Sequence, residues 1–537
     1  MNCAAPSLAA ILFSAALQTA VFPVAGPLPF WRAQLAWVAL VPWFVVLLRV
    51  SKSANRPVRN ATLLSYLCGA LWYMGHCYWI FQTMHQYGNM SSFMAAVVLV
   101  LFCLYLGLYH ALFGFLAAVL LRTNSQPIRR AAPVLLATLW VGVELARAHV
   151  TSFPWDLLGY SQVDNAALAR LAPWAGTYAI SFLVVLVNAC IACGLVSRFR
   201  SGFRNPSQRG RAALISGVTA ALVCTLLGIT IHAPMPAPDA TAVLVQPNLA
   251  AGQEERLDGP ATPLEQQLAR LSEQTIQAAQ SQDRTPHLIL WPEAPASYEV
   301  HEPAFQATLT NLARNQNSTV IADSNAVDPN SSVARRYNLY NSAALFTAEG
   351  LRARYDKIHL VPFGEFTPYA ELFSFASGLT QQVGLFDRGH LRTPLSDGTH
   401  HYGTFICYES IFPDEVRQLV LKGADVLVNL SDDGWYGDTS APFQHINMAR
   451  MRAIENRRWL LRDTNNGITA SIDPYGTVRQ SAPRHQRLAA VMQYGYSRQL
   501  TFYTRHGDLF AYACAFLSLI ALVLALTSPP SAGAAVN

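Results

Sequence analysis

Long apolar stretches alternate with short polar ones over the first 232 residues, and one more apolar stretch lies near the end of the chain. A helix needs roughly 20 mostly apolar residues to cross a membrane. Eight stretches come near that length, at residues 6–24, 33–49, 61–82, 92–121, 131–148, 171–197, 212–232 and 509–527. The pattern predicts a membrane domain with seven spanning helices over residues 1–232, and an eighth helix with a short tail within residues 508–537.

Residues 233–507 show a different pattern, in which short apolar runs alternate with amphipathic stretches. The runs predict strands at 240–249, 287–294, 318–325, 341–350, 351–361, 403–410 and 424–431, and two more within 459–476. Apolar residues at helical spacing predict helices at 264–282, 304–316, 414–423 and 441–458. Strands that alternate with helices indicate a separate α/β domain with a layered, mixed sheet.

Composition and charge place about half of this chain in a membrane and give the chain an orientation. The sequence is 52% apolar and 13% charged, whereas a soluble domain carries about 25% charged residues. Lys and Arg gather in the loops at 49–59, 122–130 and 198–211, and the loops between these are nearly free of them. By the positive-inside rule, the N-terminus is cytoplasmic and residues 233–507 face outward. The net charge of +6 largely reflects this asymmetry, so no nucleic-acid partner is expected.

Cysteine usage singles out one thiol. Seven of the nine cysteines lie in the apolar stretches: Cys68, Cys77, Cys103, Cys190, Cys193, Cys224 and Cys514. The outward-facing α/β domain has Cys407 and no partner for it. An unpaired thiol in an oxidising compartment is a candidate reactive group, although a buried structural cysteine is the commoner case.

Two charged residues of the α/β domain stand where such folds place their sites, at strand ends. Glu293 in "LILWPEAP" follows a buried run, and desolvation there would suit a general base. A solvated loop glutamate is the alternative. Lys357 in "YDKIHLVPFGEF", with Glu365 eight residues on, could stabilise an oxyanion. The alternative is a lysine whose stem runs along a strand edge.

The stretch "TFICYES" ends a predicted strand at Cys407, and a helix signal follows it. The backbone N–H of Tyr408 would then be free to donate to an oxyanion. A glutamate base, a lysine and a cysteine nucleophile together can carry out acyl transfer. His445, Met448 and Met451 in the following long helix are interpreted as core or helix-face residues.

Several motifs carry a family resemblance. "WPEA", "YDKIHLVPFGE" and "ICYES" resemble the Glu-Lys-Cys triad of the nitrilase superfamily. "SFPWDLLGYSQ", "DDGWYGDTSAPFQH" and "NMARMRAIENRRWLLRDTNNGITASIDPYG" resemble motifs of bacterial apolipoprotein N-acyltransferases. The resemblance implies a polytopic α-helical membrane protein of about eight helices. An extracytoplasmic nitrilase-like domain, an α-β-β-α sandwich over residues 233–507, would lie between the seventh and eighth helices.

The resemblance also implies roles for single residues. Glu293 matches the general base, Lys357 the oxyanion lysine, and Cys407 the thiol that carries the acyl group as a thioester. Glu365 matches a second glutamate that orients the lysine. Tyr408 and Glu409 match residues beside the nucleophile that the family also needs.

The implied reaction takes an acyl chain from a phospholipid, typically phosphatidylethanolamine, and passes it through the cysteine. The acceptor is the N-terminal amine of diacylglyceryl-cysteine on an apolipoprotein. The implied location is the bacterial inner membrane, with the catalytic domain in the periplasm and in contact with membrane lipids. The resemblance implies no metal and no diffusible cofactor. It does not determine acyl-chain preference, the lipoproteins served or the oligomeric state.

Three points stay open at this level. A membrane-tethered amidase would use the same triad but would need a single anchor, and a transporter would need charged or broken helices at mid-membrane. Trp155 and Tyr160 in "SFPWDLLGYSQ" suit either an interfacial aromatic belt or a wall beside the lipid route. The chain reads "VQPNLAAGQEERL" after the first strand of the α/β domain, without the tryptophan that family members often have there.

Overall fold

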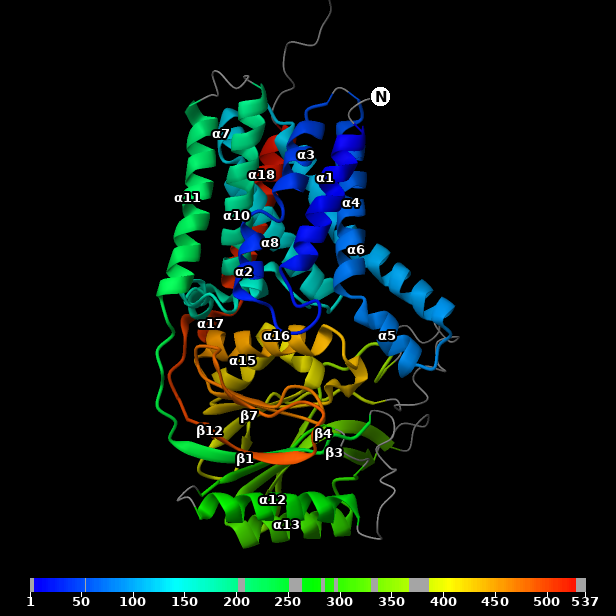
Figure 1. The fold of residues 1–537 in the computed structure, drawn as a ribbon, viewed down its shortest axis with the longest axis vertical. Helices are drawn as coiled ribbons and strands as arrows, with labels where there is room; N and C mark the ends of the chain where they lie inside the picture. Colours follow the sequence, from blue (N-terminus) through cyan, green and yellow to red (C-terminus); the bar gives the residue numbers. More distant parts are fainter. Residues whose placement is uncertain are drawn as a thin grey trace, which may run out of the picture.

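A computed structural model of the chain describes residues 4–53, 55–200, 208–250, 263–281, 285–293, 298–329, 337–366 and 386–527. The long helices of the membrane domain form a bundle that packs against one side of the layered α/β domain. Helices α15 and α16 lie between the bundle and the sheets (Figure 1). Residues 251–262, which contain most of the loop that lacks the family's tryptophan, and the tail from residue 528 lie outside the described residues.

The regular elements described in the membrane domain are all helices. Its elements are α1 Ala4–Ala20, α2 Phe30–Ala33, η1 Gln34–Trp37, α3 Val41–Val50, α4 Pro57–His76, α5 Trp79–Gln86, α6 Ser92–Leu121, α7 Gln126–Arg130, α8 Ala132–Val150, η2 Leu158–Gln162, α9 Ala166–Ala169, α10 Ala172–Arg200, α11 Gln208–Thr230 and the C-terminal α18 Leu509–Thr527. Six helical segments among the described residues are long and apolar enough to cross a membrane: α2 to α3, α6, α8, α10, α11 and α18. Because α1 and α4 are not among these six, the total of eight crossings stays a prediction.

Two apolar stretches that the sequence pattern treats as single helices are broken. The stretch at 33–49 contains the end of α2, the 3₁₀ turn η1 and then α3. The stretch at 61–82 contains most of α4 and the start of α5. Hydropathy reports where the chain is apolar but not where a helix ends, so it missed both breaks. After the second break, α5 leaves the bundle and reaches the α/β domain, where the Thr83 hydroxyl donates to the Trp435 carbonyl at 3.0 Å.

The α/β domain contains the predicted strands and helices together with several short elements. In chain order they are β1 Ala240–Gln246, α12 Leu264–Gln280, β2 Leu288–Trp291, α13 Pro303–Gln316, β3 Thr319–Pro329, β4 Tyr337–Thr347, β5 Gly350–Asp356, β6 Leu395–Ser396, β7 His401–Ile406, η4 Cys407–Ile411, α15 Pro413–Leu421, β8 Val426–Ser431, η5 Asp433–Tyr436, α16 Ala441–Asn456, β9 Leu460–Thr464, β10 Ala470–Ile472, β11 Val478–Ser481, β12 Leu488–Tyr494 and α17 Phe502–His506.

The strands form two six-stranded sheets, in the orders β12-β1-β2-β3-β4-β5 and β11-β10-β9-β8-β7-β6. Both are mixed, since β1, β2 and β3 run parallel in the first and β7, β8 and β9 in the second, while the outer pairs are antiparallel. Apolar residues from the facing sides of the two sheets form one core. Helices α12 and α13 cover the first sheet, and α15 and α16 cover the second (Figure 1). The structure therefore confirms the α-β-β-α sandwich.

The two domains share a hydrophobic core. Met448, Met451 and Ile454 of α16 are fully buried in the same cluster as the side chains of the membrane helices. α10 is kinked at Ala175 and Gly176. The N–H and hydroxyl of the next residue, Thr177, donate to Glu455 Oε1 at 3.1 and 2.7 Å. The face of the second sheet that α16 covers is thereby fixed against the membrane bundle.

Candidate active site

The side chain of Lys357 lies between two carboxylates at the end of β5. Its Nζ is 2.9 Å from Glu293 Oε1 and 2.8 Å from Glu365 Oε1, and the lysine is 1% exposed. The backbone N–H of Lys357 donates to the Asn341 carbonyl at 2.8 Å, which fixes the point where β5 ends. Burial alone would lower the pKa of Lys357, but the carboxylates of Glu293 and Glu365 raise it well above its usual range. The lysine is therefore a permanent cation.

Glu293 follows β2 and accepts hydrogen bonds on both oxygens. Asp432 N–H donates to Oε2 at 2.9 Å, and Asn341 Nδ2 donates to Oε1 at 2.9 Å and to Glu365 Oε1 at 3.1 Å. Glu365 also accepts the Val361 N–H on Oε2 at 2.8 Å. The side-chain amide of Asn341 thus links the two carboxylates that flank Lys357. The sequence pattern did not indicate a role for Asn341.

Cys407 is the first residue of the 3₁₀ turn η4. The strand β7 ends at Ile406, one residue before the predicted strand end at Cys407. Its φ of 48° lies in the left-handed region, which costs a residue other than glycine on the order of 1–3 kcal/mol and is typical of functional sites. Cys407 is buried, at 5% exposure, and the charges of Glu293 and Lys357 act on its thiol. Burial, together with the charge of Glu293, raises the pKa of Cys407 well above its usual range. The sulfur is therefore a neutral thiol until a base removes its proton.

Glu409 holds the turn against the neighbouring sheet. Its Oε2 accepts the Ile406 N–H at 2.7 Å, and its Oε1 accepts the N–H groups of Ile358 and His359 at 2.6 and 3.1 Å and the Tyr355 hydroxyl at 2.9 Å. Burial raises the pKa of Glu409 to about 6, so it remains an accepting carboxylate at neutral pH. The carboxylate ties the residue before the nucleophile to the segment that follows Lys357.

Tyr408 connects the turn to the membrane domain. Its hydroxyl donates to the Ser152 carbonyl at 3.0 Å, in the loop between α8 and η2. Trp155 in the same loop and Tyr160 in η2 are each 1% exposed and belong to the core shared by the two domains. The interpretation of Trp155 and Tyr160 as an interfacial belt is therefore wrong, because neither side chain reaches the molecular surface. Residues 153–157 of this loop are buried, and the loop contacts the turn through Ser152.

A second polar cluster lies behind the nucleophile. Asp433 Oδ2 is 2.8 Å from Arg462 Nη2, and Asp433 Oδ1 is 2.9 Å from His445 Nδ1, with all three side chains fully buried. Burial by itself would raise the pKa of Asp433, but the charge of Arg462 and the contact with His445 hold it below its usual range. The sequence interpretation of His445 as a core residue is correct about its burial but missed these contacts. No spacing signal links the three residues, since they come from η5, α16 and β9.

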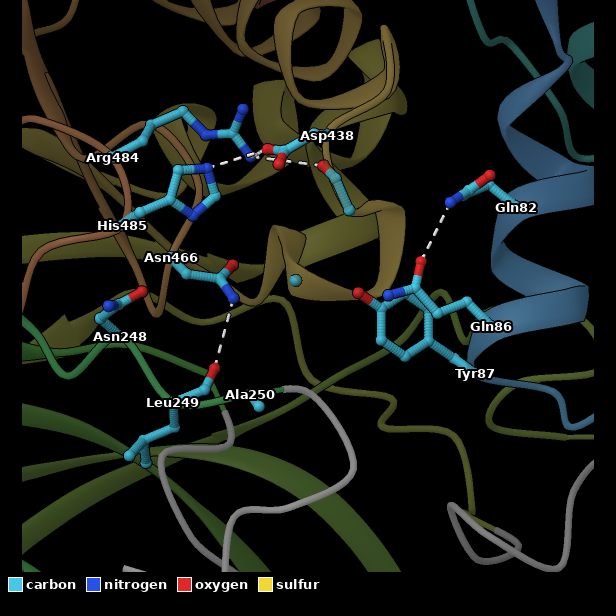
Figure 2. A pocket seen from close by; sticks show the side chains of 12 residues that line it. Gln82, Gln86, Tyr87, Asn248, Leu249, Ala250, Asp438, Asn466, Arg484 and His485 are labelled. Carbon is cyan, nitrogen blue, oxygen red and sulfur yellow. Dashed lines mark hydrogen bonds and ion pairs between the residues drawn. The ribbon is translucent and has the colours of Figure 1, made fainter.

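A polar pocket of about 710 Å³ opens beside the loop that follows β8 (Figure 2). It is lined by Gln82, Gln86, Tyr87, Asn248, Leu249, Ala250, Gly434, Gly437, Asp438, Asn466, Arg484 and His485. Asp438 pairs with His485 at 2.8 Å and with Arg484 at 3.5 Å, so the charges there are largely compensated. Amides and paired ions do not offer the apolar wall that an acyl chain needs. The pocket suits a polar group instead.

Within the described residues, no group of three or more His, Cys, Asp or Glu side chains is arranged to hold a metal ion. The chemistry available at the site is that of a base, a thiol and a fixed cation. Two stacked mixed sheets between helix layers, with these groups at strand ends, define an α/β enzyme of the nitrilase type, and here the enzyme is joined to a membrane helix bundle.

Comparisons with known proteins specify the family. A family model described as "Carbon-nitrogen hydrolase" matches residues 245–494, and one described as "Apolipoprotein N-acyltransferase N-terminal domain" matches residues 14–190. The apolipoprotein N-acyltransferase of Geobacter metallireducens is 33% identical over 525 residues, which cover 96% of this chain and 94% of that protein. The corresponding protein of Methylococcus capsulatus is 33% identical over 474 residues, 87% of each chain. The chain belongs to the apolipoprotein N-acyltransferase family.

Among solved structures, a carbon-nitrogen hydrolase from Helicobacter pylori is similar at 17% identity with a TM-score of 0.35, over 47% of this chain and 88% of that one. The family places the chain among multi-pass membrane proteins that are N-acyltransferases within the nitrilase superfamily. A membrane-tethered amidase is accordingly not the favoured function.

Proposed function

We propose that this chain carries an acyl group on Cys407 between two lipid substrates. The donor is a phospholipid, with phosphatidylethanolamine expected from the family resemblance, and the acceptor is the N-terminal amine of a diacylated apolipoprotein. The observation that supports the site assignment most directly is the buried Lys357 ammonium between the Glu293 and Glu365 carboxylates, beside the strained turn at Cys407. Such a set of groups suits acyl transfer through a covalent intermediate.

In the first step, Glu293 accepts the Cys407 proton and the sulfur attacks the ester carbonyl carbon of the phospholipid. The ammonium of Lys357 and the N–H of Tyr408 stabilise the oxyanion. The carbon–oxygen bond then breaks, and the lysophospholipid oxygen leaves with the proton from Glu293. A base is required because burial keeps the Cys407 thiol protonated. Glu365 orients Lys357, and Glu409 holds the turn.

In the second step, the apolipoprotein amine attacks the thioester carbonyl. Glu293 accepts the amine proton, the carbon–sulfur bond breaks, and the proton returns to the sulfur of Cys407. The product is an amide, and the enzyme is restored without an external oxidant, reductant or metal. Because one cysteine holds the acyl group between the two substrates, the first product leaves before the second substrate reacts.

The proposed order predicts a burst. With phospholipid alone, the enzyme is expected to release about one lysophospholipid per active site and then stop as a stable thioester. The thioester persists because a site that excludes water offers no competing acceptor. Adding a diacylated peptide with a free N-terminal amine should restart turnover. Lysophospholipid and free fatty acid are measured against time. Steady release of fatty acid without the peptide would indicate a hydrolase and contradict the proposal.

We further propose the division into a membrane domain at 1–232, a catalytic domain at 233–507 facing the periplasm, and an anchor within 508–537. The support is the distribution of positive charge. α7, with Arg129 and Arg130, and the start of α11, with Arg209 and Arg211, lie at the end of the bundle farthest from the sheets (Figure 1). Positive residues stay on the cytoplasmic side, which would place the sheets on the opposite side of the inner membrane.

Two matched variants test this orientation. Ser281→Cys places a thiol on the exposed end of α12, and Ser53→Cys places one on the exposed loop after α3. A membrane-impermeant maleimide added to intact spheroplasts is expected to label the Ser281→Cys protein above the wild-type level. The Ser53→Cys protein should be labelled only after the membrane is permeabilised. The reverse pattern would contradict the outward orientation.

A further inference from the structure

The carbonyl oxygen of Cys407 is held by a buried histidine of α16. Nε2 of His445 lies 3.1 Å from this oxygen, while Nδ1 lies 2.9 Å from Asp433 Oδ1 and 3.0 Å from Arg462 Nη2. The imidazole is fully buried and stacks on Trp155, with ring centroids 5.6 Å apart. These contacts act on both ring nitrogens and on the ring face, so they fix the imidazole relative to the nucleophile turn.

The partners of the two ring nitrogens determine where the proton lies. A carbonyl oxygen can only accept, so Nε2 must carry a hydrogen for its contact with Cys407 to be attractive. Nδ1 faces both a donor, Arg462, and an acceptor, Asp433, and has a partner in either state. Burial lowers the pKa of His445 and the charge of Arg462 lowers it further, which favours the neutral ring. Whether or not Nδ1 also carries a hydrogen, the contact with the Cys407 carbonyl requires one on Nε2.

The same peptide unit joins the Cys407 carbonyl to the Tyr408 N–H. In a trans peptide these two groups point in opposite directions, and at the start of a 3₁₀ turn the N–H has no intrahelical acceptor. We propose that His445 is a positioning residue that aims the Tyr408 N–H at the oxyanion formed during acylation of Cys407. This inference rests on the thioester mechanism proposed above. It gives His445 a role that neither the sequence pattern nor the family resemblance assigns.

A role for His445 as the base for the thiol does not fit the contacts. The hydrogen on Nε2 points at the Cys407 carbonyl, and Nδ1 faces Asp433 and Arg462. No lone pair of the ring is therefore directed at the sulfur, whereas Glu293 lies in the buried cluster on the Lys357 side. The strained φ of Cys407 also needs support from its surroundings, and His445 supplies that support on the carbonyl side.

Two reactions of the Cys407 sulfur can test whether His445 positions the oxyanion donor or acts in another way. Acylation by phospholipid passes through an oxyanion. Alkylation by iodoacetamide forms a bond from sulfur to a saturated carbon and releases iodide, with the thiol proton taken by the base, so it involves no oxyanion. Loss of the donor's orientation should slow acylation and leave alkylation unchanged. Both rates at Cys407 are followed by mass spectrometry of the full chain in phospholipid-containing micelles.

Three substitutions of His445 test whether the effect on acylation depends on the N–H at Nε2. Glutamine can place an N–H near the position of Nε2, asparagine can place one near Nδ1, and leucine supplies neither. His445→Leu and His445→Asn are expected to slow acylation about 10²-fold, the usual effect of losing one oxyanion donor. His445→Gln is expected to stay within about tenfold of the wild type. His401→Gln, at the exposed opposite end of β7, is the matched control and should change neither rate.

The outcomes distinguish this inference from the proposed function. Loss of both reactions in His445→Leu with an unchanged thermal transition would show that the histidine acts on the thiol, and normal acylation in His445→Leu would show that it does not act at all. Either result overturns the inference, as would a His445→Gln protein no better than His445→Asn. A wild-type protein that forms no thioester would instead contradict the proposed function itself.

Discussion

Replacing Cys407 with alanine is expected to abolish both the thioester and acyl transfer. The proposed mechanism has no second nucleophile, and removing the nucleophile of a covalent mechanism typically costs on the order of 10⁶ in rate. Cys407→Ser should behave in the same way, because a buried hydroxyl is far harder to ionise than a thiol. Intact-protein mass spectrometry after incubation with phospholipid measures the acyl adduct, and release of lysophospholipid measures turnover.

A matched control guards against a general effect of losing a buried thiol. Cys514 of α18 is also buried, at 3% exposure, and it lies on the other side of the domain junction. Cys514→Ala should keep both the adduct and turnover, and all three variants should show a thermal transition close to that of the wild type. An acyl adduct on Cys407→Ala would mean that another residue carries the acyl group, and Cys407 would then be a structural cysteine.

Local pattern predicted most single elements well. α6 matches the apolar stretch at 92–121, and α18 matches the stretch at 509–527. A long apolar run with polar residues at both ends defines the position of a helix. The strands β1 and β8 were predicted for the same reason. The sequence pattern could not predict that β1 pairs with β12, about 250 residues away. Such long-range pairing divides the strands into two sheets, and no local signal encodes it.

Some residues of the candidate site were predicted from the sequence, and others were found only in the fold. Glu293, Lys357 and Cys407 were found because each has reactive chemistry next to an apolar run and because the motifs resemble those of a known family. Their geometry depends on strand order, which brings the ends of β2, β5 and β7 together. Asn341 was not singled out, and His445 was interpreted as a core or helix-face residue, since a polar residue within a strand or a helix has no local mark of function. Only the fold shows that one links two carboxylates and the other holds the nucleophile's carbonyl.

Replacing Lys357 with methionine is expected to destabilise the protein and to stop acylation. The change leaves Glu293 and Glu365 as buried carboxylates without their cation, and breaking a buried ion pair in this way costs about 3–5 kcal/mol. One carboxyl should then take up a proton at neutral pH, which would compromise the base. Acylation should fall by at least about 10³-fold, because an oxyanion donor is lost as well. Thermal unfolding in detergent and single-turnover thioester formation measure the two effects.

A double variant separates these effects. Lys357→Met combined with Glu365→Gln removes one positive and one negative charge, so the cluster keeps its original net charge with a single carboxylate on Glu293. Stability should recover in part, because the repulsion is gone, whereas acylation should not recover, because no cation faces the oxyanion. Lys422→Met, at an exposed lysine after α15, is the control and should change neither quantity. If the double variant regained acylation along with stability, Lys357 would only balance charge, and stabilisation of the oxyanion would depend on the backbone N–H that His445 positions.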